Sequence, residues 1–173
     1  MSKKLIIPLV VIFWGLTITV LAQNPEGGGP MKLTSPAFQQ NQMIPPKYTC
    51  QGEDVSPPLV VENIPQGTKS LVLIVDDPDA PMGTWVHWVV YNIPVQNTIA
   101  EGSVPGHQGS NDFGKVDYGG PCPPSGTHRY FHKIYALDTT LQFSRTPSKR
   151  DVEATMKGHI LGQAELMGLY KKG

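Results

Sequence analysis

The pattern of apolar residues predicts a chain built mainly from β-strands. The strongest strand predictions are Ser70–Val75, Thr84–Ile93 and His128–Leu137, which are rich in β-branched and aromatic residues. Because Ser70–Val75 is apolar at every position after the serine, it is expected to be buried on both faces of a sheet. Two weaker strands are predicted at Lys32–Phe38 and Pro58–Glu62.

Helical periodicity occurs in one segment, toward the C-terminus. Ser148 can cap a helix there, and Asp151 and Glu153 would lie near the positive end of its dipole. Apolar positions recur at three- and four-residue intervals through Val152, Met156, Ile160, Gln163 or Ala164, and Met167, ahead of Lys171 and Lys172. The expected fold is therefore mainly β with a C-terminal helix.

The composition supports loops rather than a helical bundle. The 173 residues include 18 glycines and 17 prolines, about a fifth of the chain where roughly 12% is average. In Asn97–Gly120, Gly, Asn and Asp outnumber the apolar residues, so a long loop is expected there, and loops of that length are usually functional or disordered. The length suggests one domain.

The N-terminus resembles a secretory signal peptide. Lys3 and Lys4 precede an apolar run, Leu5–Leu21. The run leads into Ala22, and Val20-Leu21-Ala22 are small or compact residues, as signal peptidase requires before its cleavage site. We therefore expect residues 1–22 to be a signal peptide, 23–30 a flexible lead-in and 31–173 the domain, in a secreted or periplasmic protein. The alternative is an uncleaved N-terminal membrane anchor, because 17 apolar residues reach the bottom of the transmembrane range.

The charge balance argues against nucleic acid as a partner. The chain has 14 basic and 14 acidic residues, with no basic run, whereas phosphate-backbone binding needs concentrated Lys and Arg. Cleavage after Ala22 would remove Lys3 and Lys4 and leave a small negative balance.

A carboxylate cluster directly follows the apolar segment Ser70–Val75. Asp76, Asp77 and Asp79 fill three of four positions, and neighbouring prolines restrict the backbone. Carboxylates this close repel one another unless a cation lies nearby. The cluster is either a turn in which Asp side chains accept bonds from loop amides or part of a functional site.

His87 lies within the predicted strand Thr84–Ile93. Alternation places it on the same face as Trp85 and opposite Trp88. A histidine in such an apolar run is most often a hydrogen-bonded core residue, but a partner carboxylate would orient or charge it. Asp77, one strand earlier, is the candidate partner, and both interpretations stay open.

A loop of Gly and Pro leads into the strand that begins with His128. Alternation places His128, Tyr130 and His132 on one face and Arg129 on the other. Imidazole and phenol donors behind a stiff loop suit anion capture. Arg129 is either a phosphate clamp or, given its opposite face, one half of an ion pair with Asp79. His132 is expected at the surface.

Several catalytic signatures are missing from the sequence. It contains no GxSxG, P-loop or HExxH motif. The spacing of its histidines and acids does not support a metal site, so no metal or other cofactor is expected.

Cys50 and Cys122 are the two cysteines of the chain. An even pair in an exported protein favours a disulfide, which would close a loop of about 70 residues. The alternative is a pair of neighbouring buried thiols.

Three motifs, in this order, resemble the phosphatidylethanolamine-binding protein family, the group that contains Raf kinase inhibitor protein and the plant flowering-time regulators. They are Asp77-Pro78-Asp79-Ala80-Pro81, Trp85-Val86-His87-Trp88, and Gly120-Pro121-Cys122-Pro123-Pro124-Ser125-Gly126-Thr127-His128-Arg129-Tyr130. The segments Tyr48–Gly52 and Ser56–Leu59 resemble its bacterial and archaeal branch. The resemblance runs from about Met31 to Tyr170.

The resemblance implies a β-sandwich with a large antiparallel sheet and a small pocket for phosphate, acetate or a phospholipid headgroup. Carried over position by position, the ligand-binding residues are Asp77, Pro81, Trp85, His87, Pro123, Pro124, His128 and Tyr130. Asp79 and Arg129 match positions taken as structural. The proline-rich loop differs in spacing by one residue from the animal members.

The resemblance also implies a non-enzymatic binding or inhibitory protein, because family members are described as inhibitors of kinases or of serine carboxypeptidases. The signal-like N-terminus adds the expectation that it is secreted. An exported protein would meet envelope proteases rather than cytosolic kinases. The alternative function is a hydrolase or isomerase that uses the Asp/His pocket for acid–base chemistry. A third interpretation is a structural sandwich with a vestigial pocket.

Overall fold

The computed structural model describes residues 29–173. The predicted signal peptide, residues 1–22, and all but the last two residues of the lead-in lie outside this range. Within it, no helix has the length and apolarity that crossing a membrane requires.

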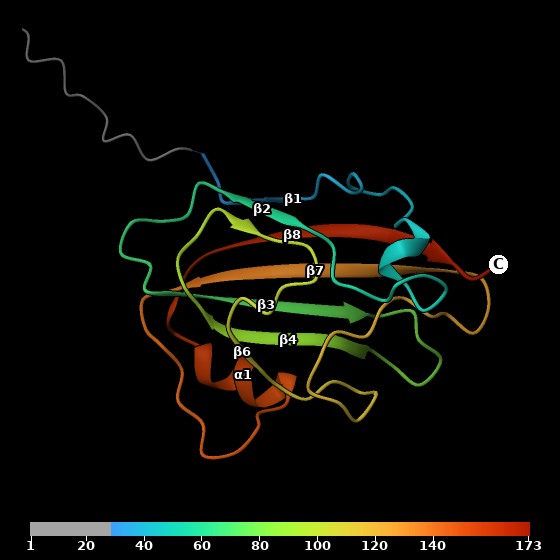
Figure 1. Ribbon diagram of the computed structural model, residues 1–173. Helices are drawn as coiled ribbons and strands as arrows, with labels where there is room; N and C mark the ends of the chain where they lie inside the picture. The colour runs from blue at the N-terminus through green and yellow to red at the C-terminus, as the bar shows by residue number, and fades with distance from the viewer. Residues whose placement is uncertain (1–28) are drawn as a thin grey trace, which may run out of the picture.

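Two antiparallel sheets form the domain, as the sequence predicts (Figure 1). The small sheet has the order β1-β2-β5, with β1 at Lys32–Thr34, β2 at Leu59–Glu62 and β5 at Thr98–Ile99. The large sheet has the order β6-β4-β3-β7-β8, formed by His107–Gln108, Trp85–Ile93, Ser70–Asp77, Thr127–Leu137 and Ile160–Lys171. A 3₁₀ turn, η1, covers Pro46–Tyr48, and one α-helix, α1, covers Lys149–Met156.

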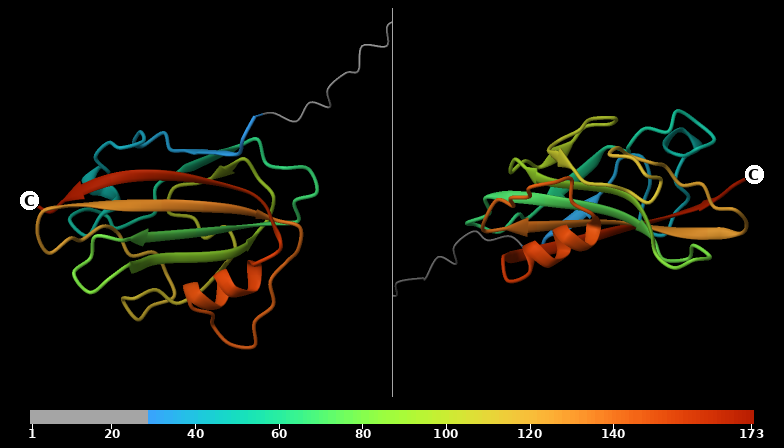
Figure 2. Two further views of the ribbon diagram at one scale, coloured as in Figure 1. Left: turned by 180° about the vertical axis from the view of Figure 1, so that it is seen from behind. Right: turned by 90° about the horizontal axis from the view of Figure 1, so that it is seen from below.

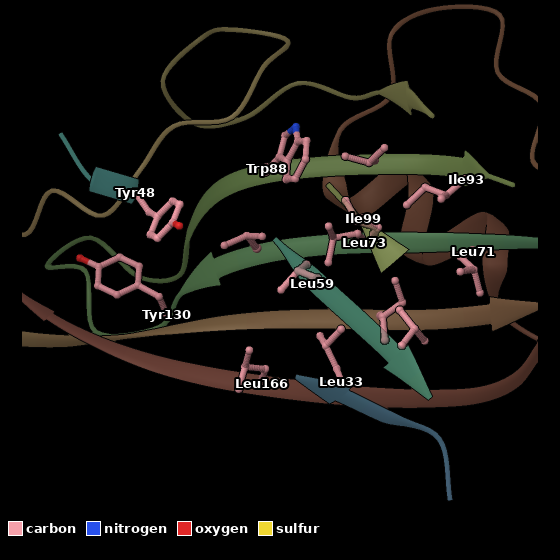
Figure 3. Packing of buried hydrophobic residues seen from close by; sticks show 14 of the residues in the cluster. Leu33, Tyr48, Leu59, Leu71, Leu73, Trp88, Ile93, Ile99, Tyr130 and Leu166 are labelled. Atoms are coloured by element: carbon pink, nitrogen blue, oxygen red, sulfur yellow. The ribbon is translucent and has the colours of Figure 1, made fainter. Parts of the chain in front are cut away.

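The main hydrophobic core lies between the two sheets (Figure 3). Leu33, Leu59 and Ile99 of the small sheet pack over Leu73 and Trp88 of the large one. This arrangement is a β-sandwich, in which each sheet buries one face against the other.

A second core lies on the other face of the large sheet, beneath α1 (Figure 2). Val152 and Met156 of the helix pack there with Val72 and Ile74 of β3. Since Leu71 and Leu73 belong to the first core, β3 is buried on both faces, which confirms the prediction from its continuous apolar run.

The predicted long C-terminal helix is wrong beyond Met156. Ser148 caps α1 as expected, and its hydroxyl and the Asp151 carboxylate form a capping box. Gly158 then adopts a positive φ of 87°, which ends helices readily, and Ile160–Lys171 forms the edge strand β8. Toward the end of β8, every second side chain is buried, as in a strand with one face against a core. The apolar residues of this segment are spaced as in a helix, but the hydrogen bonds with β7 hold it as a strand.

A β-bulge in β4 changes the direction of His87. Trp88 lies opposite Val75, whereas Val86 lies opposite Asp76, so β4 contains one extra residue at His87. Trp88 packs in the core between the sheets, on the side where the His87 ring also lies, so the expectation that these two side chains point to opposite faces is wrong.

Candidate functional site

The candidate site lies where β3 ends and β4 and β7 begin. Antiparallel pairing places Asp77 opposite Trp85 and Asp76 opposite Phe131, so one end of the large sheet gathers residues that are far apart in sequence. The loops that follow these strand ends enclose a cavity of about 190 Å³.

Most of the predicted ligand-binding residues line this one cavity. The lining residues are Asp77, Ala80, Pro81, Trp85, His87, Phe113, Cys122, Pro123, Pro124 and Tyr130. The predicted residue His128 is not among them. It is buried behind the wall of the cavity, in contact with Asp77.

Asp77 is held in place by two hydrogen bonds. Its Oδ1 accepts from the backbone N–H of Asp79 at 2.8 Å, and its Oδ2 lies 2.7 Å from Nδ1 of His128. The side chain therefore makes the turn contact expected of an Asp-Pro-Asp sequence and also borders the cavity. The turn interpretation of the carboxylate cluster is confirmed for this residue, and its part in a functional site stays a prediction.

His87 is oriented by the backbone rather than by Asp77. Its Nδ1 lies 2.6 Å from the carbonyl oxygen of Gly119, and its ring contacts Phe113 and Tyr130 edge-on at 5.3 and 5.2 Å between centroids. Burial lowers the pKa of His87, and the bond to Gly119 offsets part of this effect. The predicted Asp77–His87 pairing is therefore wrong, because the carboxylate pairs with His128 instead.

The hydroxyl of Tyr130, a lining residue, is a buried polar atom without a hydrogen-bond partner among the described residues. Burial raises the pKa of Tyr130, and the nearby Asp77 carboxylate raises it further, so the phenol keeps its proton.

Arg129 and Asp79 form the predicted ion pair outside the cavity. The guanidinium donates to both carboxylate oxygens at 2.9 and 2.6 Å, and the backbone N–H of Arg129 donates to Asp79 at 2.9 Å. The hydrogen bond from the guanidinium lowers the pKa of Asp79 to about 2. Arg129 thus fixes the turn after β3 and does not line the cavity.

The predicted disulfide holds the wall of the cavity that includes Cys122. Cys50 and Cys122 are bonded across 72 residues of sequence, with Cα atoms 5.5 Å apart. Next to this bond, the N–H of Cys50 donates to Pro121 and the N–H of Gly120 donates to the Asp54 carboxylate at 2.7 Å. The segment after η1 therefore supports the wall that carries the proline-rich loop.

The sequence reasoning missed some residues of the site and misplaced another. The prediction of one long loop over Asn97–Gly120 is wrong, because β5 and β6 lie within it. Phe113 lines the cavity from the loop after β6, and an aromatic residue in a Gly- and Asp-rich segment was the available signal. Ala80 and Cys122 also line it. The expectation that His132 is at the surface is wrong, because its side chain is 1% exposed and packs against Phe38.

Within residues 29–173, no group of three or more His, Cys, Asp or Glu side chains is arranged to hold a metal ion. The polar side-chain groups of the lining residues are the Asp77 carboxylate, the His87 imidazole, the Tyr130 phenol and the Trp85 indole N–H, and the other lining side chains are apolar.

Comparison with known proteins agrees with this fold and with the motifs that form the site. The model of the family described as phosphatidylethanolamine-binding protein matches residues 34–171. The UPF0098 protein of Pyrococcus horikoshii is 45% identical, with 98% of this chain and 90% of the relative covered. The UPF0098 protein of Methanothermobacter thermautotrophicus is 50% identical, with 83% of this chain and all of the relative covered.

Solved structures show the same similarity. A phosphatidylethanolamine-binding protein homologue from Chlamydia trachomatis superposes with a TM-score of 0.81 at 45% identity, and YbcL from Escherichia coli with a TM-score of 0.77 at 30% identity. Each comparison covers 84% of this chain and all of the other. With its motifs, its sandwich and nearly all of its described length matched in this way, the chain belongs to the phosphatidylethanolamine-binding protein family.

Proposed function

We propose that the protein binds a small anion, such as phosphate or the phosphate of a phospholipid headgroup, in this cavity and without catalysis. The observation that carries the proposal is the unpartnered hydroxyl of Tyr130, buried in a cavity that Asp77 and His87 also line. A buried hydroxyl without a partner costs about 1–3 kcal/mol, and a ligand oxygen that accepts its hydrogen bond removes this cost.

The size of the cavity supports a small ligand. Its volume of about 190 Å³ lies below the roughly 300–1,000 Å³ of sites for drug-sized molecules. A phosphate or a headgroup fragment fits this space, whereas an acyl chain would remain outside. The family description, which names a phospholipid headgroup, supports the same ligand class.

Removal of either polar side chain tests the binding proposal. We expect His87→Ala and Asp77→Ala each to abolish phosphate and phosphoethanolamine binding in titration calorimetry, with the native circular dichroism spectrum retained. Asp138→Ala is the control, since this half-exposed carboxylate pairs with His159 and does not line the cavity. Wild-type affinity in both cavity variants would refute the proposal.

An acid–base enzyme is the second candidate, because the Asp77–His128 pair at 2.7 Å is a carboxylate–imidazole unit of the kind used for proton transfer. The imidazole of that pair does not line the cavity, which favours the binding function. Turnover of phosphate esters, assayed with and without divalent metal ions and lost in His87→Ala, would replace the binding proposal with an enzymatic one.

The setting we propose is outside the cytoplasm, with an envelope protease as the target of inhibition. The signal-like residues 1–22 support export, and two apolar side chains beside the cavity offer a contact surface. Met82, next to the lining residue Pro81, is 95% exposed, and Phe113 is 41% exposed. N-terminal sequencing of the exported protein tests cleavage, and a sequence that starts at Met1 would contradict it. Assays of envelope proteases with and without the protein test inhibition, and unchanged protease activity would contradict it.

A further inference from the structure

Phe113 forms one wall of the cavity from the loop that follows β6. Its ring meets the rings of Trp85 and His87 edge-on, with centroids 5.5 and 5.3 Å apart. The ring also lies directly on the backbone of Gly119, where an added Cβ atom would come within 2.6 Å of it. Phe113 therefore fills a defined position between β4 and the segment that leads into the proline-rich loop.

The side chain of Asn111 maintains this position, because the loop folds around it. Asn111 is buried, and its Oδ1 accepts hydrogen bonds from the backbone N–H groups of Phe113 at 3.1 Å and Lys115 at 2.9 Å. Its Nδ2 donates to the carbonyl oxygen of Asp117 at 2.9 Å. One side chain thus bonds the part of the loop that carries Phe113 and also the part that returns toward Gly119.

The loop is also bonded to β4 at the bulge. The N–H of Val86 donates to the carboxylate of Asp112 at 2.7 Å, and the N–H of Asp112 donates to the carbonyl of Val86 at 3.0 Å. The N–H of Gly119 donates to the carbonyl of His87 at 3.1 Å, and the His87 ring bonds to the carbonyl of Gly119. Because the loop is bonded to β4 on both sides of Phe113, the position of this ring is fixed relative to His87.

A fixed aromatic wall limits the width of a ligand. The cavity has a volume of about 190 Å³, and Phe113 is 41% exposed, so its ring borders both the enclosed space and solvent. A substituent that a bound phosphate carries toward solvent therefore passes a rim that includes this ring. An unbranched chain needs little width there, whereas a branched or cyclic group clashes with the wall, and such clashes are one way in which a site rejects a wrong ligand.

We propose that Phe113 determines the ligand specificity of the cavity: it admits phosphate esters with a slim, unbranched substituent and excludes esters with a branched or cyclic one. Asn111 is the positioning residue that holds Phe113 in place. This inference rests on the proposed anion-binding function and narrows its ligand class to phosphate esters of primary alcohols, in which a CH₂ or CH₃ group follows the ester oxygen.

Titration calorimetry of the full chain with methyl phosphate and phenyl phosphate tests the specificity. The second pKa of a phosphate monoester is about 6, so at about pH 8 both esters are doubly charged and differ in the width of the substituent. A phenyl group that fitted would gain affinity by burying apolar surface, so weaker binding reports a clash. We expect phenyl phosphate to bind the wild type about tenfold or more weakly than methyl phosphate, since small differences in ligand size have effects of this order in closed pockets.

Substitutions of Phe113 test whether its ring causes the preference. Phe113→Ala should abolish the preference, because the space of the ring becomes available to the phenyl group. Phe113→Leu keeps part of the bulk and should give an intermediate affinity ratio. Val116→Ala is the matched control, since this residue of the same loop is 47% exposed and does not line the cavity, and it should keep the wild-type ratio.

Substitutions of Asn111 test whether it acts through Phe113. Asn111→Ala should reduce the preference, and Asn111→Asp should retain more of it, because the aspartate still accepts from the N–H of Phe113. Asn111→Ala added to Phe113→Ala should not change the affinity ratio further, as expected for residues that act as a unit. Urea unfolding of each variant gives its stability separately, and a residue with a role in stability alone would leave the ratio unchanged.

Water-soluble headgroups separate a phospholipid from a free phosphoester as the source of this chemistry. Glycerophosphoglycerol and glycerophosphoinositol carry the same charge, but the first attaches its headgroup through a CH₂ group and the second through a ring carbon. Binding of the first alone would support the specificity with a lipid headgroup as ligand. Binding of neither, with methyl phosphate bound, would support it with a free monoester as ligand, and equal binding of both would overturn it.

The remaining outcomes separate this specificity from the proposed function. Equal affinities of the wild type for methyl and phenyl phosphate, or a wild-type ratio in Phe113→Ala, would overturn the specificity and leave anion binding in place. A ratio that changes further in the double variant would overturn the role of Asn111. A lack of binding by every ester would overturn the proposed function and the specificity with it.

Discussion

His132 is a titratable side chain in an apolar setting. It is 1% exposed, and neither ring nitrogen has a hydrogen-bond partner among residues 29–173. Burial lowers its pKa to about 4, with a smaller contribution from His87. The residue therefore remains neutral in the folded protein at a pH at which an exposed histidine is charged.

This difference predicts a loss of stability in acid. Because the folded-state pKa of His132 lies below the unfolded value of about 6.5, the unfolded chain binds the extra proton as the pH falls from about 6.5 to about 4. Stability is complete above this window and falls through it, by on the order of 3 kcal/mol from this group. Urea unfolding at a series of pH values measures the loss.

His132→Leu should remove much of this dependence, because leucine fills the apolar site without ionising. At neutral pH the variant should be as stable as the wild type or more so, since two unpartnered nitrogens are removed. His107→Leu, at an exposed position, is the control. An acid transition that is identical in His132→Leu and the wild type would contradict the assignment.

At the level of elements, successive side chains of β3 point to opposite faces of the sheet, so the adjacent carboxylates Asp76 and Asp77 have different partners. Asp77 points to the cavity, whereas Asp76 points to the opposite face, where it is fully buried and bound by Lys133 of β7 and Lys149 of α1. Asp76 thereby links the central strand, its neighbour and the helix. The helix has few other polar links to the sheet, so this cluster helps to hold α1 over the second core.

Asp76→Ala should destabilise the fold by about 3 kcal/mol, at the low end for a broken buried ion pair, because both lysines are partly exposed and can turn to water. Denaturant unfolding monitored by circular dichroism gives the value. Glu153→Ala is the matched control, since it removes the exposed i,i+4 partner of Lys149 and should cost only a few tenths of a kcal/mol. Equal effects of the two substitutions would show that Asp76 does not link the elements.

At the level of the whole molecule, the disulfide joins two segments that the sheets do not join. Cys50 follows η1, and Cys122 lies in the loop before β7, where it lines the cavity. The bond therefore connects overall stability with the shape of the site. Beside it, Tyr118 donates to the carbonyl of Tyr48 at 2.9 Å, which adds a further link between the same segments.

The double variant Cys50→Ser/Cys122→Ser should lose about 4 kcal/mol of stability, as the chain-entropy model gives for a closed loop of 72 residues. Its anion affinity should also fall, because the cavity wall that includes residue 122 gains freedom. Urea unfolding and calorimetry measure the two effects. A reducing agent should shift the wild type toward the double variant and leave the variant unchanged; a wild type insensitive to reduction would contradict the prediction.

The sequence alone determined the main strands, the continuous burial of β3, the family and most of the residues that line the cavity, because these follow from apolar periodicity and from short, contiguous motifs. The positive φ at Gly158 marks the point where such local reasoning failed, since the helical spacing continued past the glycine while β7 offered a partner strand.

Only the tertiary structure decided which polar groups pair. Asp77 lies on the strand that precedes the strand of His87 in the sequence. In the sheet order β4-β3-β7, with the bulge at His87, Asp77 instead pairs with His128, and His87 bonds to the carbonyl of Gly119. Hydrogen bonds are formed between neighbours in space, and register shifts and long loops set those neighbours without a local sequence signal.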